Sequence, residues 1–140
     1  DSSHIGIANA ITINENGLNH PLYKNKDQKF NSPAFNFDEV KTLPKNAICL
    51  ASNKINKVQS LYFQINETKI WGLQYHPEIT YEKMISLIEF RKDRLIANRK
   101  AFKDEKEIHN HISFIKKEIA ISDKKKRMTE LNNWLNNLYS

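Results

Sequence analysis

The stretch WGLQYHPEIT, residues 71–80, decides how this chain is interpreted. An apolar run over residues 69–75, which we expect to be a strand, leads directly into His76, Pro77 and Glu78. Pro77 fixes its own φ and disfavours the helical conformation at His76. If the strand continues through this segment, His76 and Glu78 face the same side, about 7 Å apart at Cα. Glu78 can then accept a hydrogen bond from one imidazole nitrogen, which leaves the other nitrogen to act as a base.

Composition limits the classes of function. With 140 residues, the chain has the size of one domain, and no apolar run approaches the roughly 18 residues of a membrane span, so no membrane contact is expected. The net charge is +6, but only four of the 22 basic residues are arginine, the side chain that favours phosphate and base recognition, so we expect no nucleic-acid partner. The single cysteine, Cys49, cannot form an internal disulfide, which favours a cytoplasmic protein.

The first half of the chain has the pattern of strands and turns. β-Branched and apolar runs predict four strands, over residues 5–13, 47–52, 57–65 and 69–75. Short polar separators between the last three predict an antiparallel meander. Asn16-Gly17 is a hairpin signal and predicts a tight turn after the first strand.

The second half changes to helical spacing and predicts three amphipathic helices. The first begins at Thr80, a candidate N-cap, and the third begins at Ser122 or Asp123. Their expected packing stripes are Met84, Leu87, Ile88, Arg91 and Leu95; Ile108, Ile112, Ile115 and Ile119; and Met128, Leu131, Leu135 and Leu138.

The segment WGLQYHPE resembles the G-x-Q-[FY]-H-P-E signature of class I glutamine amidotransferases, the Cys-His-Glu family. The upstream segments HIGIANAITIN, HPLYK, FDEVKTLPKNAICLASN and KVQSLYF follow the family's order and spacing. The resemblance covers roughly residues 4–90, and within the family the chain resembles stand-alone amidotransferases that are similar to the GMP synthase glutaminase. It implies an α/β fold, the C-terminal portion of a flavodoxin-like amidotransferase domain with a helical C-terminal extension.

Through this resemblance the expected reaction is hydrolysis of glutamine to glutamate and ammonia. A cysteine thiolate attacks the side-chain carboxamide, His76 takes and later returns the proton, and Glu78 orients His76. The ammonia then passes to an acceptor or an associated synthase. The family needs no cofactor and no metal for this step, so neither is expected here.

The family's nucleophile lies in a G-x-C-x-G elbow, and residues 1–140 contain no such motif. Cys49 lies in an apolar strand, where burial would raise its pKa, so we do not expect it to replace that nucleophile. We therefore expect residues 1–100 to be a partial amidotransferase domain without the N-terminal half that carries the elbow. Residues 101–140 would be the helical extension, and the isolated chain would be inactive. We also expect removal of residues 104–140 to spare glutaminase chemistry in the full-length enzyme.

The resemblance also implies that the backbone of Asn36 and Phe37 helps to hold glutamine. The family usually has histidine where Asn36 stands, so a side-chain role would be lost, and ordinary turn chemistry is an equal interpretation of this segment. Two other functions stay open. One is a γ-glutamyl hydrolase with the same triad, and the other is a non-catalytic amidotransferase-like remnant with a binding or regulatory role.

Overall fold

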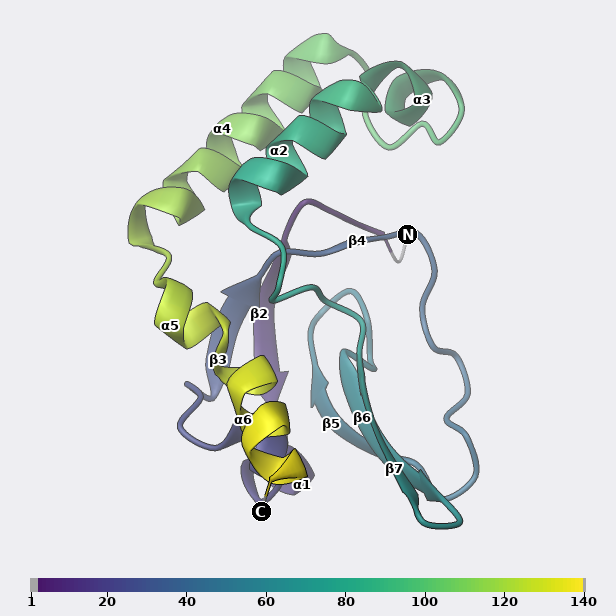
Figure 1. Cartoon of the computed structure of the whole chain (residues 1–140). Helices are drawn as coiled ribbons and strands as arrows, with labels where there is room; N and C mark the ends of the chain where they lie inside the picture. Colours follow the sequence, from purple (N-terminus) through teal and green to yellow (C-terminus); the bar gives the residue numbers. More distant parts are fainter. Residues whose placement is uncertain (1–2, 140) are drawn as a thin grey trace.

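The structure, a computed structural model, describes residues 3–139 and is a mixed α/β fold with two antiparallel sheets (Figure 1). The small sheet pairs β1 (His4–Ile5) with β4 (Phe35–Asn36). The larger sheet has the order β3-β2-β5-β6-β7. Its strands are β2 (Ala8–Ile13), β3 (Lys29–Ser32), β5 (Ile48–Ser52), β6 (Ser60–Ile65) and β7 (Thr68–Leu73). The predicted meander is confirmed, because β5, β6 and β7 are antiparallel neighbours.

The turn expected at Asn16-Gly17 is present, but it is a helical turn and not the hairpin type that the dipeptide signals. A short helix, α1 (Glu15–Leu18), follows β2, and the Asn14 side chain accepts the Gly17 N–H at 2.9 Å. The Asn14 N–H also donates to the Leu50 carbonyl at 2.9 Å. This local cap holds the backbone in a helical turn, which competes with the hairpin conformation. A 3₁₀ turn, η1 (Pro21–Tyr23), comes next and leads to β3.

The helical half follows the predicted pattern with two extra breaks. Its elements are α2 (Tyr81–Phe90), α3 (Lys92–Ala97), α4 (Glu105–Ile121), α5 (Lys124–Arg127) and α6 (Thr129–Leu138). Thr80 caps α2 and Asp123 caps α5, as the sequence indicated. The first expected helix divides at Arg91 and the third at Met128. Leu95, which follows the break at Arg91, is buried in the core, as its place in the expected stripe predicted. Within residues 3–139, no helix combines the length and apolarity needed to cross a bilayer.

Two buried clusters form the core. Helices α2 and α4 lie side by side and enclose the first cluster with Ile5 and Ile7 (Figure 1). The second cluster lies on the larger sheet and includes Leu22, Leu50 and Tyr75. The predicted stripe of α4 is buried at Ile108, Ile112 and Ile115, which confirms the helical spacing.

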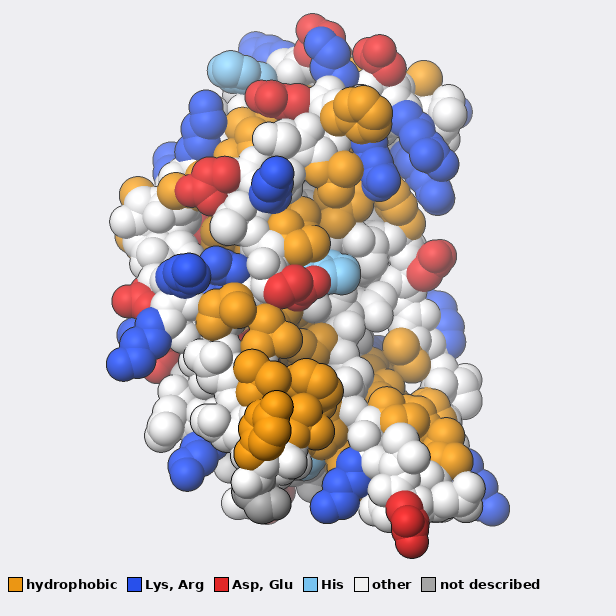
Figure 2. All heavy atoms as spheres, in the orientation of Figure 1, with side chains coloured by type: hydrophobic (Ala, Val, Ile, Leu, Met, Phe, Trp, Pro, Cys, Tyr) orange, Lys and Arg blue, Asp and Glu red, His pale blue; other side chains and the backbone are white. Residues whose placement is uncertain are grey.

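The predicted packing of the third helix is wrong for its C-terminal half. Trp134, Leu135 and Leu138 are 44–57% exposed, and hydrophobic side chains gather over α6 in Figure 2. Helix α6 contacts η1, where Asn133 Nδ2 donates to the Leu22 carbonyl, and Glu130 is its buried residue. Periodicity predicts an apolar stripe, but it does not determine which face of the helix meets the core.

Gly6 connects β1 to β2 with a φ of +87°, and a Cβ there would lie 2.7 Å from Ile115 Cδ1 and 2.9 Å from Ile88 Cδ1. We expect Gly6→Ala to lower the free energy of unfolding by about 1–3 kcal/mol, because it adds backbone strain and overpacks the first cluster. Urea unfolding measures the change. Gly72→Ala is the matched control with a smaller expected loss, since a Cβ there meets only the Leu61 side chain, at 3.1 Å and beyond. An equal effect of the two substitutions would contradict this account.

Candidate active site

His76 and Glu78 meet as predicted, but in a turn and not in a strand. Strand β7 ends at Leu73, and the Ile79 N–H donates to the His76 carbonyl at 3.2 Å, which closes a turn around Pro77. The extended conformation expected for His76 and Glu78 is therefore wrong, and the strand ends two residues before the expected residue 75. The turn brings His76 Nδ1 to 2.8 Å from Glu78 Oε1. Both side chains are close to half exposed, at 43% and 47%.

The contact assigns roles to the two imidazole nitrogens. With Glu78 ionised, Nδ1 carries a proton and donates it to the carboxylate. In neutral His76, Nε2 then has its lone pair free, and it makes no hydrogen bond with the residues that the structure describes. An imidazole held in one tautomer by a carboxylate is the arrangement that general base catalysis uses.

Neighbouring segments hold the turn on both sides. The His76 N–H donates to the Pro33 carbonyl at 2.8 Å. On the other side the Arg127 guanidinium donates to the carbonyls of Pro77 and Ile79, the latter at 3.4 Å. The turn is thus tied both to the segment before β4 and to the C-terminal helices.

Tyr75, directly before His76, is buried and anchors the start of the turn. Its hydroxyl lies 2.9 Å from the Tyr23 hydroxyl, which donates to Ser60 Oγ at 2.6 Å. Burial raises the pKa of both phenols, so both stay neutral at physiological pH. A fully buried side chain at residue 75 restricts the position of the next residue, His76.

The structure brings the segment of Asn36 and Phe37 beside the turn through a contact of Gln74 with Asp38. Gln74 Nε2 donates to the Asp38 carbonyl at 2.8 Å, close to where Pro33 accepts the His76 N–H. The Asn36 side chain donates to the same Asp38 carbonyl at 2.8 Å, which is ordinary local turn chemistry. The Phe37 ring packs under the Arg99 guanidinium at 4.2 Å.

Cys49 has the properties of an unreactive thiol. It lies in β5, and its sulfur is 3.4 Å from the carbonyls of Ala51 and Lys57. Burial raises its pKa above the ordinary value of 9.0. These features agree with the expectation that Cys49 does not replace the family nucleophile.

We expect the alkylation rate of Cys49 by iodoacetamide to keep rising as the pH passes 9.0, because the thiolate forms only above the raised pKa. Mass spectrometry of the modified peptide measures the rate, and glutathione serves as the reference thiol. We also expect Cys49→Ser to leave glutamine hydrolysis by the full-length protein unchanged. A rate that levels off near neutral pH would contradict this interpretation.

Sequence reasoning missed Arg127 and Glu130. The buried Glu130 carboxylate lies 2.7 Å from Lys26 Nζ, in a pair whose side chains are 0% and 6% exposed. Neither residue stands in a motif, and both contact segments about 50 or more positions away in the sequence. A weak signal for Arg127 exists, because it ends the lysine run DKKKR in a chain with four arginines. Among residues 3–139, no group of three or more His, Cys, Asp or Glu side chains is placed to hold a metal.

The fold and the candidate site together describe an α/β protein with an exposed, carboxylate-oriented histidine, a pairing found in hydrolases. The curated proteins that resemble this chain carry such activities in their names. A γ-glutamyl-L-1-hydroxyisopropylamide hydrolase of Pseudomonas sp is 32% identical over 73 residues, which are 52% of this chain and 24% of that protein. A glutamine-hydrolyzing GMP synthase of Phocaeicola vulgatus is 33% identical over 64 residues, 46% of this chain and 12% of that protein. One subunit of the glutamine-hydrolyzing GMP synthase of Methanocaldococcus jannaschii is 38% identical over 61 residues, 43% of this chain and 31% of that protein.

These relatives confirm the resemblance to class I glutamine amidotransferases that the sequence motif indicated. The chain spans less than one third of the length of each of them. No family model matches the chain. A solved structure titled "Crystal structure of SMU.1228c" shares the fold with a TM-score of 0.64 and 17% identity, over 99% of this chain and 53% of that one.

Proposed function

We propose that this chain is the histidine- and glutamate-bearing part of a glutamine amidotransferase that hydrolyses glutamine to glutamate and ammonia. The observation that supports this most strongly is the 2.8 Å contact between His76 Nδ1 and Glu78 Oε1 in an exposed turn. Such a pair supplies general acid–base chemistry but no nucleophile. The curated relatives, which act on a γ-glutamyl amide or on glutamine by name, support the choice of substrate.

The proposed mechanism uses a cysteine outside the 140 residues. His76 Nε2 accepts the thiol proton, and the thiolate attacks the side-chain carbonyl of glutamine. When the C–N bond breaks, the imidazolium returns the proton to the departing ammonia and leaves a γ-glutamyl thioester. His76 then removes a proton from water, which cleaves the thioester to glutamate and restores the thiol. Glu78 holds the imidazole in the required tautomer throughout.

The domain organisation belongs to the same proposal. Residues 1–100 would be the partial amidotransferase domain, completed by a flavodoxin-like half that carries the nucleophile. Residues 101–140 would be the helical extension, and the chain alone would be inactive. The backbone of Asn36 and Phe37, tied to the turn through Gln74 and Asp38, would help to hold glutamine. An acceptor or a synthase would take up the ammonia, as the names of the GMP synthase relatives suggest.

A second candidate is hydrolysis of a γ-glutamyl alkylamide by the same residues. The Pseudomonas relative favours it, because its name specifies such an amide. Both substrates present the same γ-glutamyl group to His76 and Glu78, and only the departing amine differs. The near-half exposure of both side chains leaves room for either leaving group.

The test is glutamate release by the full-length protein, measured with glutamine and with a γ-glutamyl alkylamide at equal concentrations. We expect a higher kcat/KM for glutamine, with ammonia formed in equal amount to glutamate. A strong preference for the alkylamide would replace the first function with the second. No hydrolysis of either substrate by the folded full-length protein would overturn both and leave a non-catalytic role.

A further inference from the structure

The C-terminal helices reach the candidate active site through one side chain. Arg127, the last residue of α5, donates hydrogen bonds from the same guanidinium nitrogen to the carbonyls of Pro77 and Ile79. These carbonyls flank Glu78 in the chain, so the guanidinium contacts the backbone on both sides of the carboxylate. Among the described residues, the ion pair of Glu78 is with His76 and not with Arg127. Arg127 therefore restrains the turn without competing for Glu78.

We propose that Arg127 is a positioning residue for the His76–Glu78 pair, and that residues 123–133 form a strap that keeps it in place. This inference rests on the proposed function of that pair, and it reverses the expectation that residues 104–140 are dispensable. Nη1 carries two N–H bonds in the fixed plane of the guanidinium, so this one nitrogen can donate to both carbonyls, whereas a lysine ammonium is a flexible point charge.

The strap is anchored at its first end by the cap of α5. The Asp123 carboxylate accepts the Lys126 N–H at 3.0 Å, and the Arg127 N–H donates to the Asp123 carbonyl at 2.9 Å. Lys26 Nζ donates to the Lys126 carbonyl at 2.8 Å from the loop before β3. The backbone that carries Arg127 is therefore fixed to the sheet region directly beside the arginine.

The other end of the strap is held by buried polar contacts. The Glu130 carboxylate pairs with Lys26 at 2.7 Å, and Asn133 Nδ2 donates to the carbonyls of Leu22 and Lys24 at 2.8 and 2.9 Å. These contacts fix the second end of the strap to η1 and to the loop before β3.

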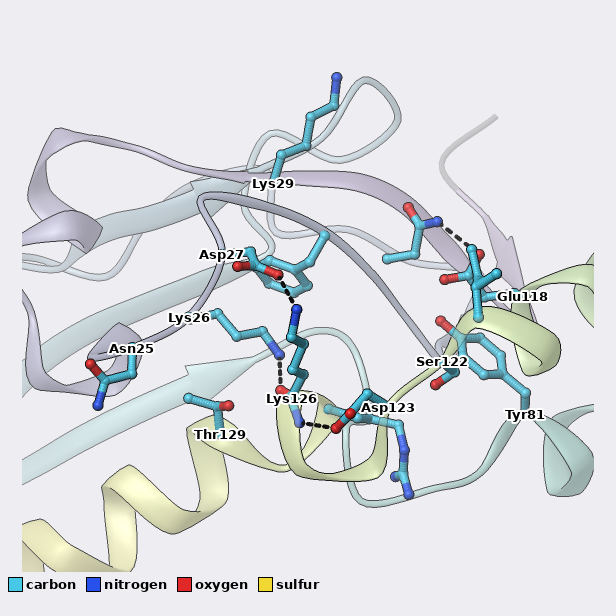
Figure 3. A pocket seen from close by; sticks show the side chains of 14 residues that line it. Asn25, Lys26, Asp27, Lys29, Tyr81, Glu118, Ser122, Asp123, Lys126 and Thr129 are labelled. Atoms are coloured by element: carbon cyan, nitrogen blue, oxygen red, sulfur yellow. Dashed lines mark hydrogen bonds and ion pairs between the residues drawn. The ribbon is translucent and has the colours of Figure 1, made fainter.

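Among the described residues, none of the strap belongs to either buried apolar cluster, so these polar contacts are what ties it to the sheet. A cavity of about 400 Å³ lies between the loop before β3 and the start of the strap. Figure 3 shows Lys26 and Lys126 reaching across its edge, with Lys126 paired to Asp27 at 3.5 Å. Arg127 contacts the turn only through polar contacts with two of its carbonyls, and it belongs to neither buried cluster. Replacing Arg127 should therefore loosen the turn without removing a core residue.

The experiment compares Arg127→Met and Arg127→Lys in the full-length protein, with Lys125→Met as the control on the same helix. Lys125 is exposed, and within residues 3–139 its side chain forms no ion pair with the turn. We expect Arg127→Met to lower kcat for glutamine about 10- to 100-fold with KM changed by less than about twofold, because the base is misplaced while substrate contacts persist. The loss in kcat should be smaller for Arg127→Lys, and the kcat of Lys125→Met should equal that of the wild type.

A second readout does not need activity. Proton–nitrogen correlation spectra of the imidazole report whether His76 Nδ1 keeps its hydrogen-bonded proton at a pH where the ring is neutral. We expect that signal to be retained in the wild type and in Lys125→Met and to be lost or divided between tautomers in Arg127→Met. If Arg127→Met does not fold, a partial change in Arg127→Lys supports the same inference.

The inference is overturned if Arg127→Met folds and keeps both the wild-type kcat and the wild-type imidazole signal. It is also overturned if Arg127→Lys is indistinguishable from the wild type when Arg127→Met cannot be folded. Failure of the proposed function gives a different result, because the wild type then releases no glutamate. The imidazole signal still decides the role of Arg127 in that case.

Discussion

Replacing His76 with alanine should lower kcat/KM for glutamine in the full-length protein by about 10²- to 10⁴-fold, the usual contribution of a general acid–base residue. The imidazole is the only described group in the turn that Glu78 orients, and its free nitrogen is the proposed proton acceptor. Coupled detection of glutamate gives the rates. His109→Ala is the matched control, because this exposed histidine lies on α4, far along the chain from the turn.

The companion change, Glu78→Gln, separates orientation from acid–base chemistry. Glutamine preserves the size of the side chain but can offer either a donor or an acceptor to Nδ1, so the imidazole loses its fixed tautomer. We expect a loss of about 10²- to 10⁴-fold in kcat, since a histidine in the wrong tautomer cannot accept the proton. Glu78→Asp should retain more activity than Glu78→Gln, because it keeps the negative charge and only shortens the side chain. Wild-type kcat in Glu78→Gln would show that Glu78 does not orient the base.

The largest expected effect on stability comes from the ion pair between Lys26 and Glu130. Both side chains are nearly inaccessible to water, at 6% and 0% exposure, and Lys26 also lies over the Phe30 ring at 4.4 Å. Lys26→Met leaves the Glu130 carboxylate buried without its cation. We expect a loss of about 3–5 kcal/mol in the free energy of unfolding, measured by urea denaturation.

The control is the double variant Lys26→Met, Glu130→Met. Removing both charges takes away the desolvation penalty along with the attraction, so the double variant should be more stable than Lys26→Met alone. A buried charge without a partner costs more than about 1 kcal/mol. If the free energy of unfolding of Lys26→Met lies within about 1 kcal/mol of the wild-type value, the pair does not anchor the strap.

Much of the fold could be predicted from local patterns. The meander of β5, β6 and β7 follows from alternating runs with short polar separators, and Thr80 caps α2 as its sequence position indicated. The hairpin at Asn16-Gly17 could not be predicted correctly, because the Asn14 side chain and the Leu50 carbonyl determine that turn from outside the dipeptide. A local cap from Asn14 and one tertiary contact with Leu50 together outweigh the signal of the dipeptide.

The candidate site was predictable in its chemistry and not in its geometry. The spacing of His76 and Glu78 indicated the pair, but a turn and not a strand brings the side chains together. The strand ends early where Tyr75 enters the core to meet Tyr23. Arg127 lies 50 positions from Pro77 in the chain, and no local pattern relates two residues at such a separation.

The same limit applies to the apolar face of α6. Its stripe was predicted, yet Leu135 and Leu138 are exposed while Glu130 is buried. The buried partner Lys26 and the carbonyls that accept from Asn133 determine which face turns inward. Hydrophobic spacing therefore described the helix but not its orientation.

The central claim is that His76 is the base of an amide-hydrolysing site, and chemical rescue tests it most directly. The measurement is glutamate release from glutamine by full-length His76→Ala as the concentration of added imidazole increases. We predict a large loss without imidazole and a rate that rises with the imidazole free base, while the wild-type rate does not change. Wild-type kcat/KM in His76→Ala without imidazole would contradict this claim.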